Sequence, residues 1–131
     1  EYIKHKLMFE KQEKVILLCL NSRLEIIQEK LLFIGSGDAS MLETKEVFQH
    51  TLRCGANRII LIHNHPSGLN APSLRDIKMA QSLTETIKRL GLNIPLFYIY
   101  VSDIGYTLYN ANSASSDFDP AKLLDSIIVK P

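Results

Sequence analysis

The sequence lacks the features that would place the protein in a membrane or outside the cell. No apolar run in its 131 residues approaches the roughly 18 residues that a membrane-spanning helix needs. The N-terminus also lacks the basic, apolar and small-residue order of a signal peptide. These absences predict a soluble, cytoplasmic protein without a membrane partner.

Cysteine is scarce and poorly spaced for chemistry. Cys19 and Cys54 are the only two cysteines, and each lies in or next to an apolar segment. Reduced, buried thiols are therefore the favoured interpretation, with a disulfide as the lesser alternative. The C-x-x-C spacing of a thiolate zinc site is absent. This absence also excludes a zinc deaminase, which needs H-x-E together with C-x-x-C.

A large net charge is missing as well. Lysine and arginine number 15 and aspartate and glutamate 14, so the formal charge is +1. A near-neutral chain without a basic stripe interleaved with aromatic residues has little with which to bind phosphates. The charge of this domain therefore does not support nucleic acid as a partner. A missing N-terminal region is the remaining route by which nucleic acid could bind. The oligomeric state is not encoded in any readable pattern.

What the sequence does contain is enough apolar residues for one globular core. At 46% hydrophobic and 22% charged residues, the composition suits a single domain over residues 1–131. Residues 1–12 are interpreted as a trimmed N-terminal edge with a short helix, and residues 111–131 as a variable tail with a closing helix. Short apolar runs between turn signals predict strands. The predicted strands are Val15–Leu20, Leu24–Ile34, Arg58–His63, Ile94–Val101 and Tyr106–Tyr109.

Two internal helices are predicted between these strands. The first has its N-cap at Thr44 and ends at Gly55 in a left-handed conformation, and the second runs from Leu74 to Leu90 and stops at Gly91. Because hairpins join some strands and helices join others, the predicted fold is α/β, a mixed β-sheet flanked by helices. The predicted apolar face of the first helix comprises Val47, Phe48, Thr51 and Leu52.

The most informative pattern is H-x-H-x7-S-x2-D, which spans the end of one strand and the start of the second helix. Residues two apart on an extended strand point to the same side, so His63 and His65 can present both rings to one point. Asp76, in the first helical turn, can return its carboxylate to that point. Two imidazoles and a carboxylate suit zinc, with a fourth position left for water.

Simpler interpretations exist for each of these residues. A single histidine in a loop is more often packed or hydrogen-bonded than bound to a metal. Ser73 and Asp76 also match the capping box S-x-x-[DE], in which the serine caps the helix and the acid reaches back. For the Ser73 and Asp76 pair alone the cap is favoured, whereas His63 and His65 just upstream favour the metal site.

A zinc hydrolase also needs a carboxylate that moves the proton. Glu13 is the preferred candidate, because it opens the first apolar strand next to the strand that ends at His63. The competing acids are more naturally exposed strand, loop or helix residues, and the sequence does not separate them from Glu13. They are Glu10, Glu25, Glu29, Glu43 and Glu46.

The full pattern resembles the JAMM motif of the JAB/MPN metalloprotease family, and the hexapeptide His63–Gly68 resembles its RadC branch. The resemblance extends from about Glu13 to Tyr109 and includes Lys45-Glu46-Val47-Phe48 and Cys54-Gly55-Ala56-Asn57. It implies a three-layer fold, with a mixed sheet between helices, and a catalytic zinc ion. It also implies roles for individual residues: His63, His65 and Asp76 hold the zinc, Glu13 is the general base and Ser73 stabilises the oxyanion.

The chain departs from RadC-like sequences in two places. Phe97-Tyr98 stands where an Asp-His pair is usual, before Val101-Ser102-Asp103. The helix-hairpin-helix region usual upstream is absent, which predicts that the chain is the C-terminal, catalytic-type domain of a longer protein.

The leading prediction is a zinc-dependent hydrolase of the JAMM metallopeptidase type. Its substrate would be a peptide or protein, cleaved at an amide or isopeptide bond. The alternative is a non-catalytic binding or scaffold domain associated with DNA repair, with a structural or vestigial metal site.

Overall fold

The structure is a computed structural model that describes residues 13–35, 44–64, 73–102 and 105–110. Five strands and two helices are defined within these ranges. The elements are β1 (Glu13–Leu20), β2 (Ile26–Gly35), α2 (Thr44–Arg53), β3 (Arg58–Asn64), α3 (Leu74–Arg89), β4 (Leu96–Ser102) and β5 (Gly105–Asn110). The two terminal helices predicted from the sequence lie outside the described residues.

The strands form a single mixed sheet in the order β2-β1-β3-β4-β5. Neighbouring strands are antiparallel except for β3 and β4, which are parallel. A parallel pair needs a long crossover, and α3 provides it, whereas β1 and β2 are joined by a hairpin. The predicted α/β fold with a mixed sheet is therefore confirmed.

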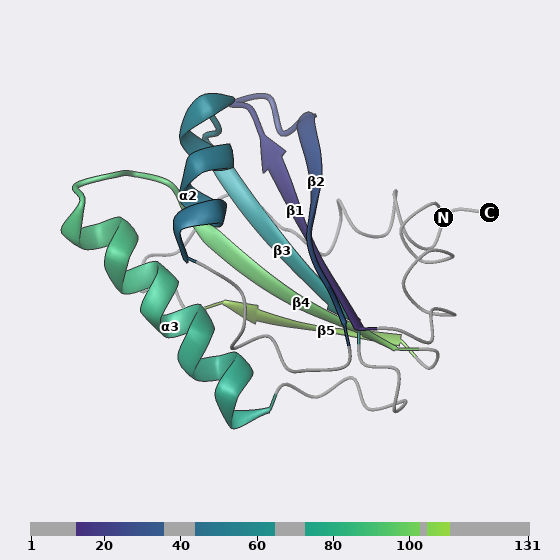
Figure 1. Cartoon of the computed structure of the whole chain (residues 1–131). Helices are drawn as coiled ribbons and strands as arrows, with labels where there is room; N and C mark the ends of the chain where they lie inside the picture. Colours follow the sequence, from purple (N-terminus) through teal and green to yellow (C-terminus); the bar gives the residue numbers. More distant parts are fainter. Residues whose placement is uncertain (1–12, 36–43, 65–72, 103–104, 111–131) are drawn as a thin grey trace.

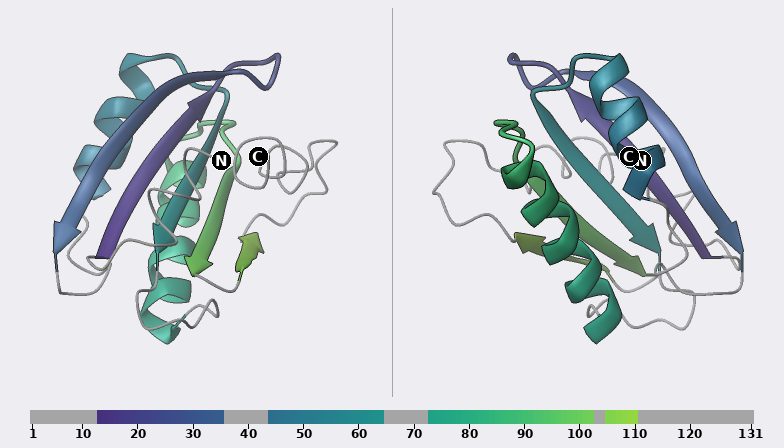
Figure 2. Two further views of the ribbon diagram at one scale, coloured as in Figure 1. Left: turned by 90° about the vertical axis from the view of Figure 1, so that its right-hand side faces the viewer. Right: turned by 60° about the vertical axis from the view of Figure 1, so that its left-hand side comes forward.

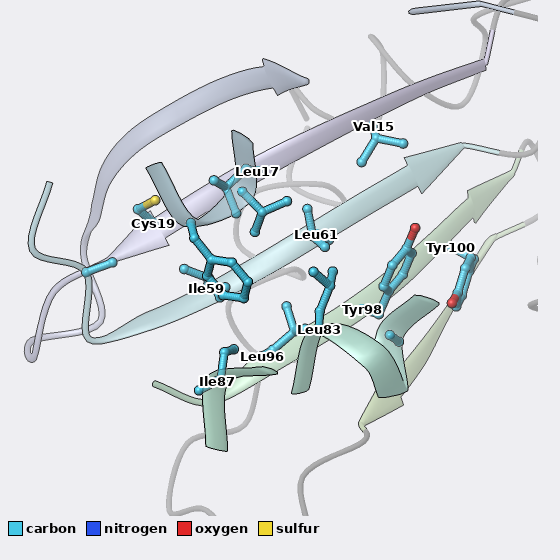
Figure 3. Packing of buried hydrophobic residues seen from close by; sticks show 14 residues of the cluster. Val15, Leu17, Cys19, Ile59, Leu61, Leu83, Ile87, Leu96, Tyr98 and Tyr100 are labelled. Atoms are coloured by element: carbon cyan, nitrogen blue, oxygen red, sulfur yellow. The ribbon is translucent and has the colours of Figure 1, made fainter. Parts of the chain in front are cut away.

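Both described helices, α2 and α3, cover the same face of the sheet (Figures 1 and 2). We call this the helix face. Its buried residues come from alternate positions of the strands, and buried residues of α2 and α3 pack onto them (Figure 3). On the three central strands these positions are Val15, Leu17, Cys19, Ile59, Leu61, Leu96, Tyr98 and Tyr100.

The remaining positions of the central strands form the opposite face, which is equally buried. Strands covered on both faces read as continuous apolar runs rather than as alternating ones, and β1, β3 and β4 follow this rule. The described helices supply one layer over the sheet. The second helical layer of the predicted three-layer fold stays a prediction. The opposite face comprises Ile16, Leu18, Leu20, Ile60, Ile62, Phe97, Ile99 and Val101.

The helix ends agree with the predicted stop signals. Gly55 has φ 66° and Gly91 has φ 70°, the left-handed conformation that glycine adopts without steric cost. Pro95 lies just before β4, and its carbonyl accepts a hydrogen bond from the Ile59 amide at 3.1 Å. Thr44, predicted as the N-cap, is instead the first residue of α2.

One prediction for α2 was wrong. Val47, Phe48 and Thr51 are buried, but Leu52 is 54% exposed. With 3.6 residues per turn, Leu52 lies about 90° from the centre of the face formed by the other three. Its apolar side chain therefore misses the core.

Two further expectations concern the cysteines and the membrane. Cys19 and Cys54 are both free, and Cys19 is buried. None of the helices in the described ranges has the length and apolar character needed to span a bilayer.

Candidate functional site

The candidate site lies where β3 ends and α3 begins. His63 is the penultimate residue of β3, a strand flanked on both sides, and is 1% exposed. Its backbone pairs with Val15 of β1 and with Tyr100 of β4. Asp76 is the third residue of α3 and is 3% exposed. Two ionisable side chains are thus buried together, which is costly unless they interact.

The His63 and Asp76 side chains face each other. His63 Nδ1 and Asp76 Oδ1 are 3.4 Å apart. This separation is longer than the 2.7–3.2 Å of an ordinary N–H···O hydrogen bond. Two ligands held about 2.1 Å from a zinc ion at the tetrahedral angle would be about 3.4 Å apart. The spacing and the chemistry of these donor atoms therefore fit a shared zinc ion.

The capping box predicted for α3 is also present. Ser73 Oγ accepts a hydrogen bond from the Asp76 amide at 3.1 Å, and Asp76 Oδ2 accepts one from the Ser73 amide at 2.9 Å. Asp76 therefore divides its two oxygens: Oδ2 starts the helix and Oδ1 faces His63. The cap holds the carboxylate in one orientation, so the two interpretations of Asp76 are compatible.

Ser73 keeps a hydrogen-bond donor outside the cap. Its hydroxyl oxygen serves the cap as an acceptor, whereas a serine hydroxyl also carries one hydrogen of its own. The residue is exposed at the N-terminus of α3. The arrangement can thus offer an O–H group to a bound molecule, in the positive field of a helix N-terminus.

The sheet register places the backbone of Glu13 at the same end of the sheet as His63. Glu13 is the first residue of β1 and lies two residues before Val15, which pairs with His63. The adjoining Lys14 amide donates a hydrogen bond to Asn64 Oδ1, which joins the start of β1 to the end of β3. The predicted approach of β1 to β3 is therefore confirmed, while the Glu13 side chain lies outside the described atoms.

Some of the competing acids lie elsewhere. Glu25 Oε1 accepts a hydrogen bond from Asn21 at 3.0 Å in the hairpin turn, at the other end of β1. Glu29 is exposed on β2. Glu46 is in the first turn of α2, and residues 10 and 43 are outside the described ranges.

His65 also lies outside the described ranges. In the part of the chain that the structure describes, no group of three His, Cys, Asp or Glu side chains is gathered as a metal site would require. His63 and Asp76 are thus the two members of the predicted ligand set whose side chains are described, and the structure brings these two together.

Sequence reasoning missed two tyrosines whose rings lie beside His63. Tyr98 and Tyr100 of β4 are fully buried, with ring centroids 6.3 Å and 6.2 Å from the imidazole. Burial raises the pKa of the Tyr100 phenol, and the nearby Asp76 carboxylate raises it further. Tyr100 is therefore a neutral phenol at ordinary pH. The register of β4 against β3 places the two tyrosines beside His63, and no local motif encodes that register.

Comparison with known proteins identifies the family of the chain. A family model described as RadC-like JAB domain matches residues 1–104. A UPF0758 protein of Streptococcus suis is 36% identical over 109 residues, which cover 83% of this chain and 44% of that protein. A UPF0758 protein of Methanosarcina barkeri is 39% identical over 89 residues, or 68% of this chain and 39% of that protein.

A third relative, a UPF0758 protein of Bacillus cereus, is 36% identical over 102 residues, which cover 78% of this chain and 45% of the relative. The chain therefore spans less than half the length of these curated relatives. With a mixed sheet, a matching family model and the histidine–aspartate pair at the end of β3, the chain belongs to the RadC-like JAB domain family.

Proposed function

We propose that the chain is a zinc-dependent hydrolase that cleaves an amide or isopeptide bond in a peptide or protein. The observation that carries the proposal is the buried contact of 3.4 Å between His63 Nδ1 and Asp76 Oδ1. His63, His65 and Asp76 would hold the zinc. When bound, zinc lowers the pKa of a water molecule and polarises a carbonyl group.

Glu13 is proposed as the general base. A carboxylate at the start of β1 would accept a proton from the attacking water and return it to the leaving amine. The support is the register, in which β1 begins at the end of the sheet where His63 lies. Proton transfer by a positioned side chain contributes about 10²- to 10⁴-fold to rate.

Ser73 is proposed as a donor to the oxygen that gains negative charge. Its hydroxyl oxygen accepts a bond from the Asp76 amide, and this contact fixes the hydroxyl while its hydrogen remains available to donate. Donors fixed in advance at such a position stabilise the transition state without having to reorganise.

The capping box is also compatible with a second candidate function. Because Asp76 Oδ2 has a structural task at the start of α3, the fold has a use for this carboxylate even without catalysis. A non-catalytic binding or scaffold domain associated with DNA repair therefore stays a candidate, with a structural or vestigial metal site. Such a domain would gain no hydrolytic activity from zinc.

One experiment separates the two candidates. Protein washed free of loosely bound metal is analysed for zinc and incubated with an unbiased peptide library. We expect one zinc per chain and cleavage of a subset of peptides. Glu13→Gln should retain zinc but lose about 10²- to 10⁴-fold in cleavage rate, whereas Glu29→Gln, at an exposed position on β2, should change neither.

Substitutions of the metal ligands complete this test. His65→Ala should lose zinc, and His50→Ala, at a half-buried histidine of α2, should retain it. Absence of stoichiometric zinc, with no change in metal content for His65→Ala, would reject the hydrolase. Zinc retention without cleavage in wild type would favour the scaffold.

A further inference from the structure

We propose that Tyr98 and Tyr100 are positioning residues that fix the orientation of the His63 imidazole. The proposal deepens the proposed function, since it explains how one predicted ligand is held ready for zinc. It rests on three observed features: the register of β4, the stacking of the two rings, and the contact of both rings with one imidazole.

The register brings Tyr100 beside His63. In the parallel pairing of β3 with β4, His63 is the partner of Tyr100, and Leu61 is the partner of Tyr98. Both tyrosines belong to the helix face and are at most 1% exposed. Their rings therefore lie next to the imidazole in the buried core.

The two tyrosine rings stack on each other. Their centroids are 4.6 Å apart, with an interplanar angle of 17° (Figure 3). Alternate residues of a strand are about 6.6 Å apart along the chain, so the rings lean toward each other. On the far side of β4, Tyr109 of β5 pairs with Tyr98 and accepts a hydrogen bond from Gln81 of α3 at 3.3 Å. These contacts of β5 support β4, which carries both tyrosines, on the side away from His63.

Both tyrosine rings are inclined to the plane of the imidazole. Tyr98 and the His63 ring are inclined at 63°, and Tyr100 and the His63 ring at 52°. The terminal torsion of a histidine is intrinsically broad and roughly two-fold, so the side chain does not by itself decide which ring edge faces Asp76. Close packing restricts the plane of the imidazole, because each inclined ring blocks part of the rotation. Within that plane, Asp76 favours the ring edge that carries Nδ1, which lies 3.4 Å from its Oδ1.

Removing the rings tests this role, and a neighbouring aromatic residue provides a matched control. Tyr98→Leu and Tyr100→Leu each remove an aromatic ring, whereas Tyr98→Phe and Tyr100→Phe keep it. Phe97→Leu removes an equally buried ring of the same strand from the opposite face. Should a leucine variant not fold, Tyr98→Met or Tyr100→Met replaces it, because methionine fills irregular space well.

The first readout uses metal-free protein, so it does not depend on the proposed function. Nuclear magnetic resonance of the His63 ring reports its environment and its rotation. We expect the leucine variants to shift and broaden the ring signals, and the phenylalanine variants and Phe97→Leu to leave them close to wild type. Unchanged His63 signals in both leucine variants would overturn the positioning role.

The second readout is metal affinity, measured by competition with a zinc chelator, together with the visible spectrum of the protein loaded with Co²⁺. The leucine variants should lose about 10-fold or more in zinc affinity, the size typical for groups that orient a ligand. Their cobalt spectrum should change, while Phe97→Leu matches wild type in both measurements. Equal affinity and spectra for the leucine variants and Phe97→Leu would reject the proposal. Failure of wild type to bind zinc would reject the proposed function alone, and the ring signals would then decide the positioning role.

Discussion

The two faces of the sheet use the same three central strands for different purposes. The buried hydrophobic cluster of the opposite face consists of aliphatic residues and Phe97. The helix face contains His63, Tyr98 and Tyr100 at one end, and Asp76 of α3 is buried over it. A shift of one residue along a strand exchanges one face for the other. Neighbouring residues of one strand can therefore contribute separately to stability and to the site.

The sharpest contrast is between His63 and Ile62, which are neighbours on β3 and point to different faces. His63→Ala should abolish zinc binding and reduce cleavage below detection, because it removes a proposed ligand. Ile62→Ala should lower the free energy of unfolding by about 2–5 kcal/mol, the usual range for emptying a buried position.

Zinc titration and chemical denaturation of the two variants test this contrast. Folded Ile62→Ala protein should bind one zinc per chain with the affinity of wild type. Loss of zinc from Ile62→Ala at a concentration of denaturant where it remains folded would show that the two faces are not separable.

Ser73→Ala should have the next largest effect. Loss of the capping hydroxyl should destabilise the protein by about 1 kcal/mol. Loss of the proposed oxyanion donor should reduce the cleavage rate by about 10²- to 10³-fold, with zinc content unchanged. Steady-state kinetics and zinc analysis on one preparation measure both effects.

A hydroxyl at the other end of α3 provides the control for Ser73→Ala. Thr86 Oγ1 bonds to the Ser82 carbonyl at 2.9 Å and lies away from the site. Thr86→Ala should therefore leave the cleavage rate unchanged. A rate for Ser73→Ala within two- or three-fold of wild type, on the order of experimental scatter, would limit Ser73 to its role as a cap.

Alkaline pH should affect stability through a thiol of the helix face that the proposed chemistry does not use. Burial raises the pKa of Cys19 from its ordinary value of 9.0 to about 12, and a hydrogen bond with Cys54 adds to the shift. Since the folded pKa is above the unfolded one, the thiol contributes stability that is complete below pH 9 and is lost as the pH rises toward 12.

Denaturant unfolding across that pH range measures the effect. Cys19→Ala should show a shallower decline of the free energy of unfolding than wild type. The difference between the two proteins is compared because Tyr100 also has a raised pKa and contributes its own decline. Parallel declines in the two proteins would contradict a role for the Cys19 thiol.

How much the sequence predicts depends on how local the cause is. Gly55 and Gly91 end their helices through their own backbone conformation, and both were confirmed. The proximity of His63 and Asp76 joins a strand and a helix that follow each other in the chain, so the spacing of the motif indicated it.

Features that depend on long-range pairing were harder to predict. Tyr100 lies beside His63 only because β3 and β4 pair in one particular register, across a helical crossover. The sequence marked Tyr98 as a departure from related chains but gave no sign that its ring contacts His63. Leu52 shows a different failure, because an apolar residue next to the buried side of α2 is not necessarily part of that side.

The most direct test of the central claim is a crystal structure of the zinc-soaked protein with anomalous diffraction recorded on both sides of the zinc absorption edge. The account predicts one anomalous peak bonded to His63, His65 and Asp76, at about 2.0–2.2 Å from each ligand atom. A fully folded protein with no peak there, or with the zinc bound elsewhere while His63 and Asp76 contact only each other, would contradict it.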